Sequence, residues 1–270
     1  MSLIEIIVLA LLQGFTEFLP VSSSAHLILV PMLTGWRDQG LAFDLALHLG
    51  SLAAVVIYFR RELLQISASL LRSVAGRGTD AHARLGWAVG FGTIPVGLAG
   101  LAFKPQIETV LRTPETGALV MAFGLIFFGL VLWVADARFR GARTVEQIGW
   151  KDVLIIGLAQ ALALIPGTSR SGITMTAGLM LGFCRESASR FSFLLSIPVI
   201  LLAVLLKSLD LFVPGAQVDW NALLWGTLLS GLAAYACIHY FLAFINRIGM
   251  LPFVLYRLLL GAALLWLFWP

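Results

Sequence analysis

Residues 17–26 read EFLPVSSSAH, a polar decapeptide inside the apolar region 2–34. A carboxylate, a proline, three serines and a histidine interrupt any helix that would cross a membrane there. Irregular backbone at membrane depth is tolerated only where it is buried in protein or lines a wet cavity. A second apolar region, 153–183, is interrupted in the same way by PGTSRSGIT at residues 166–174. Both broken regions are therefore predicted to be re-entrant helical hairpins.

The composition around these breaks is that of a membrane protein. The chain has 270 residues, of which 60% are hydrophobic and 12% charged, whereas soluble domains are roughly 45–50% apolar. A crossing helix needs about 20 mainly apolar residues. Six stretches qualify: 42–59, 85–103, 117–135, 191–212, 221–243 and 252–269. We predict an all-α polytopic membrane protein with six transmembrane helices and two re-entrant hairpins, forming one integral membrane domain over residues 1–270.

The two breaks also indicate an internal repeat. QGFTEFLPVSSSAHL at 13–27 and AQALALIPGTSRSGIT at 159–174 each place a glutamine before a proline and a hydroxyl-rich turn. Each is followed by three spans, which predicts repeats over 1–135 and 153–270 joined by a basic loop, 136–152. A hairpin returns to its own side and three crossings are odd, so the second repeat starts on the opposite face. The repeat is therefore predicted to be inverted, an architecture that builds a site where broken helices meet.

Basic loop residues predict the orientation, because cytoplasmic loops carry an excess of Lys and Arg. The N-terminal side receives four: Arg37, Lys104, Arg112 and Lys207. The other side receives twelve: Arg60, Arg61, Arg72, Arg77, Arg84, Arg138, Arg140, Arg143, Lys151, Arg185, Arg190 and Arg247. The second side is predicted to be cytoplasmic, which places both termini and the opening of the first hairpin on the periplasmic side. This dispersed charge favours topology over nucleic-acid binding, and the first apolar run is expected to be retained.

The second break has the features of an anion site. Gly167 and Gly172 allow backbone N–H groups to approach a ligand, and the following helix points its N-terminus at the same place. Arg170 adds a planar guanidinium suited to bidentate phosphate binding. Three hydroxyl donors accompany it: Ser169, Ser171 and Thr174. Phosphate is the anion that this arrangement favours, and the absence of a Lys-Ser or Lys-Thr pair argues against a nucleotide-binding P-loop.

The first break has the features of a catalytic site. Gln13 and Glu17 are four residues apart and share a helical face, where an amide oxygen and a carboxylate could hold a hard cation. His26 follows Ser23 by three residues, so a hydroxyl and an imidazole could act on one reacting group. Ser22 is assigned to substrate binding, with a capping role left open.

Each of these charges also has a purely structural interpretation. Glu17 and Arg170 could form a buried ion pair that joins the hairpins, and this would be compatible with function. Asp44 and His48, also four apart, could be either an outer support of the site or a local pair. The other ionisable candidates are expected to be structural: His82, His239, Cys184 and Cys237.

At the two breaks the chain closely resembles the bacterial undecaprenyl-diphosphate phosphatase family, also called the bacitracin-resistance family. The family's first signature, Glu or Gln followed four residues later by Glu, matches Gln13 and Glu17 and runs into LPVSSS-x-H at 19–26. Its second, PGxSRSxxT, matches 166–174 in full. Gln13 is the neutral option at its position, which implies weaker metal binding.

The resemblance implies an enzyme of the bacterial plasma membrane that hydrolyses a C55 isoprenyl diphosphate to the monophosphate with Mg²⁺ or Ca²⁺. This reaction recycles the lipid carrier for peptidoglycan synthesis and confers bacitracin resistance. Arg170 with the hydroxyls of its loop would bind the diphosphate, Glu17 and Gln13 would hold the cation, and His26 would be the general acid or base. The nucleophile is either Ser23 or an activated water.

Two competing interpretations follow from the same residues. A transporter or flippase for a phosphorylated polyprenyl lipid would use the same inverted repeat, but it has little use for an acid–base group. A type 2 phosphatidic acid phosphatase needs a histidine six residues after a Ser-Arg pair, where this chain has Thr176 and Ser196, so we reject it. Membrane lipids are the expected surroundings, and a homodimer is one oligomeric state that the sequence allows.

Overall fold

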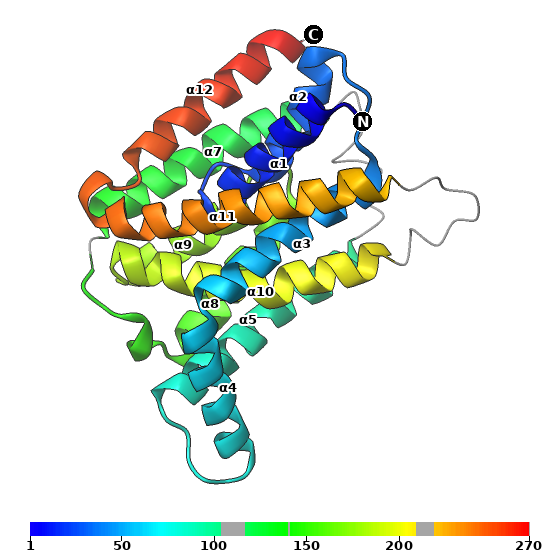
Figure 1. The fold of residues 1–270 in the computed structure, drawn as a ribbon. Helices are drawn as coiled ribbons and strands as arrows, with labels where there is room; N and C mark the ends of the chain where they lie inside the picture. Colours follow the sequence, from blue (N-terminus) through cyan, green and yellow to red (C-terminus); the bar gives the residue numbers. More distant parts are fainter. Residues whose placement is uncertain (104–116, 140, 209–218, 270) are drawn as a thin grey trace.

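The computed structural model describes residues 1–103, 117–139, 141–208 and 219–269. Every regular element in this part of the chain is helical (Figure 1). The α-helices are α1 (Leu3–Phe18), α2 (Ser23–Thr34), α3 (Gly40–Tyr58), α4 (Arg60–Val74), α5 (Ala81–Ala102), α7 (Gly117–Arg138), α8 (Trp150–Ala161), α9 (Arg170–Met180), α10 (Arg185–Ser208), α11 (Trp220–Ile248) and α12 (Leu251–Phe268). Two short 3-10 helices are η2 (Val145–Gln147) and η3 (Leu162–Leu164).

Six of these helices, α3, α5, α7, α10, α11 and α12, are long and apolar enough to cross a membrane. They coincide with the six predicted spans, so the prediction of a multi-pass membrane protein is confirmed. The largest difference at a boundary is in α10, which begins at Arg185 instead of residue 191. Its early start is stabilised by ion pairs, since Arg185 binds Asp136 and Arg190 binds Glu62 at 2.8 Å.

The two predicted breaks are present as helix interruptions. The region 2–34 is divided into α1 and α2, and 153–183 into α8, η3 and α9. The halves contain 16, 12, 12 and 11 residues, and at 1.5 Å per residue none approaches the roughly 30 Å of the hydrocarbon core. The residues before α2 and α9, Ser22 and Ser169, have φ of 73° and 69°, a conformation that L-residues adopt only under constraint.

Helix α4 was not predicted, since residues 60–84 were expected to form a loop. Its arginines lower the hydropathy below that of a crossing helix, yet one face is apolar. Ile66 on that face is buried, and the Ser69 hydroxyl donates a 2.9 Å hydrogen bond to Asp80 before α5. The helix projects from one side of the bundle (Figure 1).

Each broken helix pair packs against spans of the other half of the chain. α1 lies against α11, and α8 lies against α5. α9 lies against α7, while α2 contributes Ala25 and Leu29 to a buried cluster with α7 and α12. The contact of α1 with α11 is close, because a Cβ at Gly14 would lie 2.5 Å from the Ser230 carbonyl oxygen.

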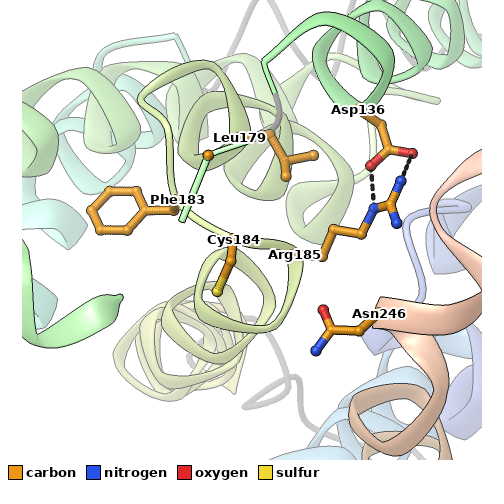
Figure 2. Close-up of a pocket in the computed structure, with 7 residues that line it drawn as sticks. Asp136, Leu179, Phe183, Cys184, Arg185 and Asn246 are labelled. Atoms are coloured by element: carbon orange, nitrogen blue, oxygen red, sulfur yellow. Dashed lines mark hydrogen bonds and ion pairs between the residues drawn. The ribbon is translucent and has the colours of Figure 1, made fainter. Parts of the chain in front are cut away.

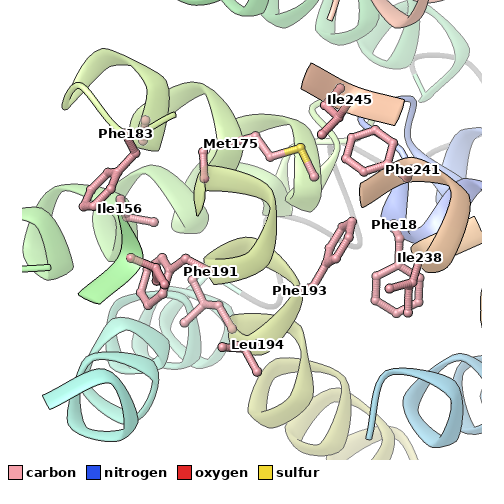
Figure 3. Close-up of a cluster of buried hydrophobic side chains, with 14 of the residues drawn as sticks. Phe18, Ile156, Met175, Phe183, Phe191, Phe193, Leu194, Ile238, Phe241 and Ile245 are labelled. Carbon is pink, nitrogen blue, oxygen red and sulfur yellow. The ribbon is translucent and has the colours of Figure 1, made fainter. Parts of the chain in front are cut away.

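The largest buried cluster holds the end of α1 in place (Figure 3). Phe18 packs edge-on against Phe193 of α10, with ring centroids 5.2 Å apart. Phe241 of α11 also packs against Phe193, with ring centroids 5.7 Å apart. Because Phe18 directly follows Glu17, this aromatic packing fixes the position of the carboxylate.

The segment between α7 and α8 is held against the end of the second broken pair, α8 and α9. Arg143 exchanges backbone hydrogen bonds with Gly182 and Cys184, at 3.1 and 2.9 Å, and its guanidinium binds Asp152 at 2.6 Å. Nearby, Asp136 pairs with Arg185 beside a cavity of about 190 Å³ (Figure 2). These contacts tie together the ends of α7, α9 and α10 that lie farthest from the chain termini.

Candidate active site

The site begins with an ion pair between the two breaks. Arg170 is the first residue of α9 and Glu17 lies in the last turn of α1, 153 residues earlier. Arg170 Nη2 donates to Glu17 Oε1 at 3.0 Å, and Nη1 donates to the Ser192 carbonyl oxygen at 2.9 Å. The side chains of Glu17 and Arg170 are only 9% and 12% exposed. The buried ion pair that the sequence analysis allowed, compatible with a role in function, is therefore present.

The second oxygen of the Glu17 carboxylate gathers the other polar groups of the first break. Gln13 Nε2 donates to Oε2 at 3.1 Å, as their spacing of four residues predicts. The Ser23 hydroxyl donates to the same oxygen at 2.7 Å. Gln13 is fully buried, and its Oε1 has no hydrogen-bond partner in the described part of the chain.

The hydroxyls of the second break hold its loop in shape. The Ser169 Oγ caps α9 by accepting from the Gly172 N–H at 3.1 Å. The Ser171 hydroxyl donates to the Leu19 carbonyl oxygen at 2.8 Å and thereby joins the two breaks. Thr174 Oγ1 lies 2.7 Å from the Ser192 hydroxyl. All three are buried beside Arg170, where they keep its backbone rigid.

The structure places His26 at one edge of this group. Its Nδ1 lies 2.7 Å from the Ser22 carbonyl oxygen, and its Nε2 lies 2.5 Å from the Tyr256 hydroxyl. The two rings stack with an interplanar angle of 8°. Ser22 is buried, and its Oγ lies 3.3 Å from the Ser24 hydroxyl. His26 and Ser22 thus lie next to Ser23 in the chain, with polar contacts of their own.

His48 is brought to the site from α3. Its Nε2 lies 4.0 Å from Glu17 Oε2, and its Nδ1 lies 2.7 Å from the Asp44 carbonyl oxygen. The Asp44 carboxylate does not orient the ring but accepts from Gln39 at 2.9 Å. A cavity of about 220 Å³ opens beside His48 and also reaches Ser24, Pro166 and Lys207. Each break therefore contributes a residue, Ser24 or Pro166, to the lining of one cavity that also holds charged side chains.

Comparison with known proteins finds a family that covers both motifs, since they lie within the matched region. The profile of a family described as "Bacitracin resistance protein BacA" matches residues 6–263. The chain belongs to the BacA family.

Relatives in the BacA family match over almost the full length of the chain. A protein from Nitrosococcus oceani named "Undecaprenyl-diphosphatase" is 58% identical over 268 residues, covering 99% of this chain and all of the relative. "Undecaprenyl-diphosphatase 2" of Stutzerimonas stutzeri is 59% identical, with 99% of both chains covered. A protein from Thioalkalivibrio sulfidiphilus, also named "Undecaprenyl-diphosphatase", is 58% identical over the whole of both chains.

One residue that the sequence did not reveal, Arg257, contacts both breaks. Arg257 of α12 is fully buried and donates to carbonyl oxygens from the first break, the second break and α7. The acceptors are Pro20 at 3.2 Å, Leu125 at 3.2 Å, Gly124 at 3.3 Å, Gly167 at 3.1 Å and Thr168 at 2.9 Å. An arginine inside an apolar span was the available signal, because such residues are rarely kept without a role.

The donor set of this BacA family member fits a divalent cation that the substrate helps to bind. The described residues contain no cluster of three His, Cys, Asp or Glu side chains that could enclose a metal. The unpartnered Gln13 Oε1 and the Glu17 carboxylate are oxygen donors of the kind that Mg²⁺ and Ca²⁺ prefer. Mg²⁺ commonly takes only one or two protein ligands and completes its shell with water and phosphate oxygens.

Proposed function

We propose that this protein is an undecaprenyl-diphosphatase of the bacterial plasma membrane. It hydrolyses the C55 isoprenyl diphosphate to the monophosphate and orthophosphate, recycles the carrier for peptidoglycan synthesis and so confers bacitracin resistance. Membership of the BacA family and the names of its relatives support this activity. The observation that carries the proposal is the contact of Glu17 with both Arg170 and the Ser23 hydroxyl, 3.0 and 2.7 Å away.

In the proposed reaction, Arg170 leaves Glu17 for the diphosphate. A planar guanidinium can hold two phosphate oxygens and stabilise the charge that develops in phosphoryl transfer. The N-terminus of α9, rigidified by Ser169, Ser171 and Thr174, adds backbone N–H groups. The buried hydroxyls contribute by keeping this anion site fixed.

Ser23 is the proposed nucleophile. Its Oγ bonds to the terminal phosphorus while the anhydride P–O bond breaks, and the lipid monophosphate leaves with the electron pair. The hydroxyl proton moves toward Glu17 Oε2, the acceptor of its hydrogen bond. Water then attacks the phosphoserine, releasing orthophosphate and restoring the hydroxyl. The acid–base role of His26 and substrate binding by Ser22 stay predictions.

A bound Mg²⁺ or Ca²⁺ would neutralise charge on the diphosphate. Glu17 and Gln13 are the proposed protein ligands, with diphosphate oxygens completing the shell. Glu17 is also the partner of Arg170, so in the loaded site a cation would take the place of Arg170 beside Glu17, and the diphosphate would take the place of Glu17 beside Arg170. This exchange suits a site that must stay neutral at membrane depth when it is empty.

We also propose that the two halves form an inverted repeat whose re-entrant hairpins enter from opposite sides. Reciprocal packing supports it, because α1 lies against α11 and α8 against α5, the second spans of the opposite repeats. The charge count then places the cavity beside His48 on the periplasmic side. Three residues of that count, Lys104, Arg112 and Arg140, lie outside the described residues. The division into repeats 1–135 and 153–270 and a homodimer stay predictions.

Single cysteines would test this orientation. In a Cys184→Ser, Cys237→Ser background, we expect Arg37→Cys to react with a membrane-impermeant thiol reagent in intact spheroplasts, and Arg77→Cys only after lysis. Both native arginines are exposed in the structure. Labelling of the Arg77 variant in intact spheroplasts would show that the orientation is reversed.

The activity is tested with purified protein in detergent. We expect orthophosphate release from undecaprenyl diphosphate with Mg²⁺ or Ca²⁺, and its loss in Arg170→Ala. A lipid transporter or flippase, which the inverted repeat would also suit, would instead move the lipid between leaflets without releasing phosphate. Binding without orthophosphate release would therefore contradict the proposed function.

A further inference from the structure

Helix α4 has an apolar face that the rest of the protein covers only in part. Ile66, at one edge of this face, is buried against Gly86 of α5. Leu64, Leu71 and Val74 follow one another at spacings of seven and three residues, which places them on the same side of the helix. They are 71%, 72% and 71% exposed. Because α4 projects from one side of the bundle (Figure 1), these three side chains face away from the protein.

The other exposed side of α4 is basic. Arg61, Gln65 and Arg72 recur at spacings of four and seven residues, so they share a side of the helix, and all three are exposed. Arg77 follows in the turn after the helix and is exposed as well. The helix therefore presents arginines along one side and large apolar residues along another.

The carboxylates next to these arginines are already engaged. Glu62 forms an ion pair with α10 at 2.8 Å. Asp80 caps α5, and Arg72 Nη2 lies 3.7 Å from its carboxylate. Within the described part of the chain, no carboxylate forms an ion pair with Arg61 or Arg77. The positive charge of these two arginines is thus available to an anion outside the protein.

A row of aromatic side chains places α4 at the level of the membrane surface. Trp87 of α5 donates from its indole nitrogen to the Ser73 hydroxyl oxygen near the end of α4, at 3.3 Å. Phe91 contacts both Trp87 and Trp150, the first residue of α8, with ring centroids 5.7 and 5.4 Å apart. Trp150 is 61% exposed, and tryptophan is enriched where the bilayer meets water. Helix α4 therefore lies beside an interfacial aromatic belt.

We propose that α4 binds an anionic lipid surface. Leu64, Leu71 and Val74 enter the boundary between head groups and acyl chains, while Arg61 and Arg77 bind the phosphates of anionic head groups. Helices with a basic side and an apolar side lie in the plane of this boundary, and basic residues near a membrane surface attract anionic lipids. This surface is separate from the candidate active site, and the inference does not depend on the proposed function.

Binding of α4 would also fix the depth of the second broken pair. Helix α5 packs against both α4 and α8, so it connects the lipid-bound helix to the segment that precedes Arg170.

Fluorescence quenching of a single label tests the proposal. In a Cys184→Ser, Cys237→Ser background, the cysteine of Leu71→Cys is labelled with an environment-sensitive fluorophore, and the full-length protein is placed in phosphatidylcholine nanodiscs that contain phosphatidylglycerol. Gln65→Cys is the matched control, because Gln65 is exposed on the basic side of the same helix. We expect nitroxide-labelled lipids to quench the label at position 71, and aqueous iodide to quench the label at position 65.

The same label tests recognition of charge. Nitroxide-labelled phosphatidylglycerol should quench the label at position 71 more strongly than nitroxide-labelled phosphatidylcholine at equal mole fraction. Arg61→Gln should lower this preference about fivefold, the contribution of one arginine near an anionic surface. Arg37→Gln removes the same charge from an exposed position before α3 and should leave the preference unchanged.

Three results would overturn the inference. Iodide quenching as strong at position 71 as at position 65 would put the apolar face in water. A label at position 71 that neither quencher reaches would show that protein, such as a second copy of the chain, covers this face. Equal quenching by the two nitroxide lipids would show that the arginines do not select an anionic head group. Should Leu71→Cys not fold, Leu64→Cys reports on the same face with the same expectations.

Discussion

The two helix breaks are built alike but carry opposite charges, Glu17 in the first and Arg170 in the second. In each, a buried glutamine, Gln13 or Gln160, precedes a proline, and a serine with positive φ, Ser22 or Ser169, lies directly before the next helix. In the first break an anion lies in the last turn of a helix, and in the second a cation is the first residue of one. Helix dipoles favour cations at the C-terminal end and anions at the N-terminal end.

Glu17 and Arg170 therefore each lie at the unfavourable end of their own helix. Neither charge stabilises the segment that carries it, and each is tolerated because the other break supplies its partner at 3.0 Å. Such residues lower local stability and are kept where function requires them. In the proposed reaction this difference becomes a division of roles: the first break would supply the nucleophile and carboxylate, and the second the guanidinium that binds phosphate.

Arg170→Lys should have the largest effect. The charge is kept, but the fork that bridges Glu17 Oε1 and the Ser192 carbonyl oxygen becomes a point charge. We expect kcat for orthophosphate release to fall about 1,000-fold, the upper range for loss of a charge-stabilising donor. Near-normal turnover would show that the second break contributes charge alone.

Glu17→Gln should reduce turnover about 100-fold, since the first break loses its proton acceptor while the shape is retained. It should also flatten the dependence of the rate on added Mg²⁺ or Ca²⁺, because an amide is a poorer ligand for a hard cation. Titration of each cation into EDTA-treated protein, with the rate of orthophosphate release as readout, measures this dependence.

Gln13→Glu is the matched variant, which should remain active and reach saturation at lower cation concentration. An inactive Gln13→Glu beside an active Glu17→Gln would reverse the assigned ligands.

Arg257→Met tests what the breaks share. It leaves carbonyl oxygens of both breaks without their buried donor, at a cost of about 3 kcal/mol. We expect a clearly lower thermal midpoint in detergent, while Arg84→Met, at an exposed position on α5, changes little. If both variants melt together with the wild type, Arg257 does not join the breaks.

The smallest effect is expected from Ser22→Gly compared with Ser169→Gly. Glycine adopts positive φ without strain in both, which should raise the free energy of unfolding by about 1 kcal/mol. Only Ser169 loses a helix cap, its bond to the Gly172 N–H. Thermal midpoints should therefore rise more for Ser22→Gly, and equal shifts would contradict the claimed asymmetry of the caps.

Much of the fold follows from sequence because lipid imposes strong constraints. Charges are rare inside spans, so the six crossings and both interruptions are visible in the hydropathy. Helix α4 was not predicted because its arginines lower its mean hydropathy below that of a membrane span. Part of its apolar face packs on a neighbouring helix, and it does not cross the membrane. The position of the broken helix pairs depends on packing between distant helices, which no local pattern specifies.

In the candidate site too, contacts set by local spacing were predictable from the sequence, and contacts set by packing of distant helices were not. Local spacing predicted that Gln13 and Glu17 share a helical face, and the structure has them in hydrogen-bond contact. The paired motifs singled out Glu17 and Arg170, which the structure joins in an ion pair. Spacing did not reveal which histidine faces the carboxylate. The rotation of α3 relative to α1 decides this, and it brings His48 Nε2 to 4.0 Å from Glu17. Likewise, the partners of Arg257 come from segments up to 237 residues away in the chain.

These long separations set an order of events during biosynthesis. At roughly 5–20 residues per second, Glu17 emerges from the ribosome about 8 to 30 seconds before Arg170, which follows it by 153 residues. Arg257, which closes the frame beneath both breaks, emerges later still. The nascent protein therefore holds an unmatched carboxylate in α1 while the first three of its six spans, α3, α5 and α7, are being made. Insertion factors and membrane proteases encounter the broken helix pair α1 and α2 as an unfinished segment until α12 arrives.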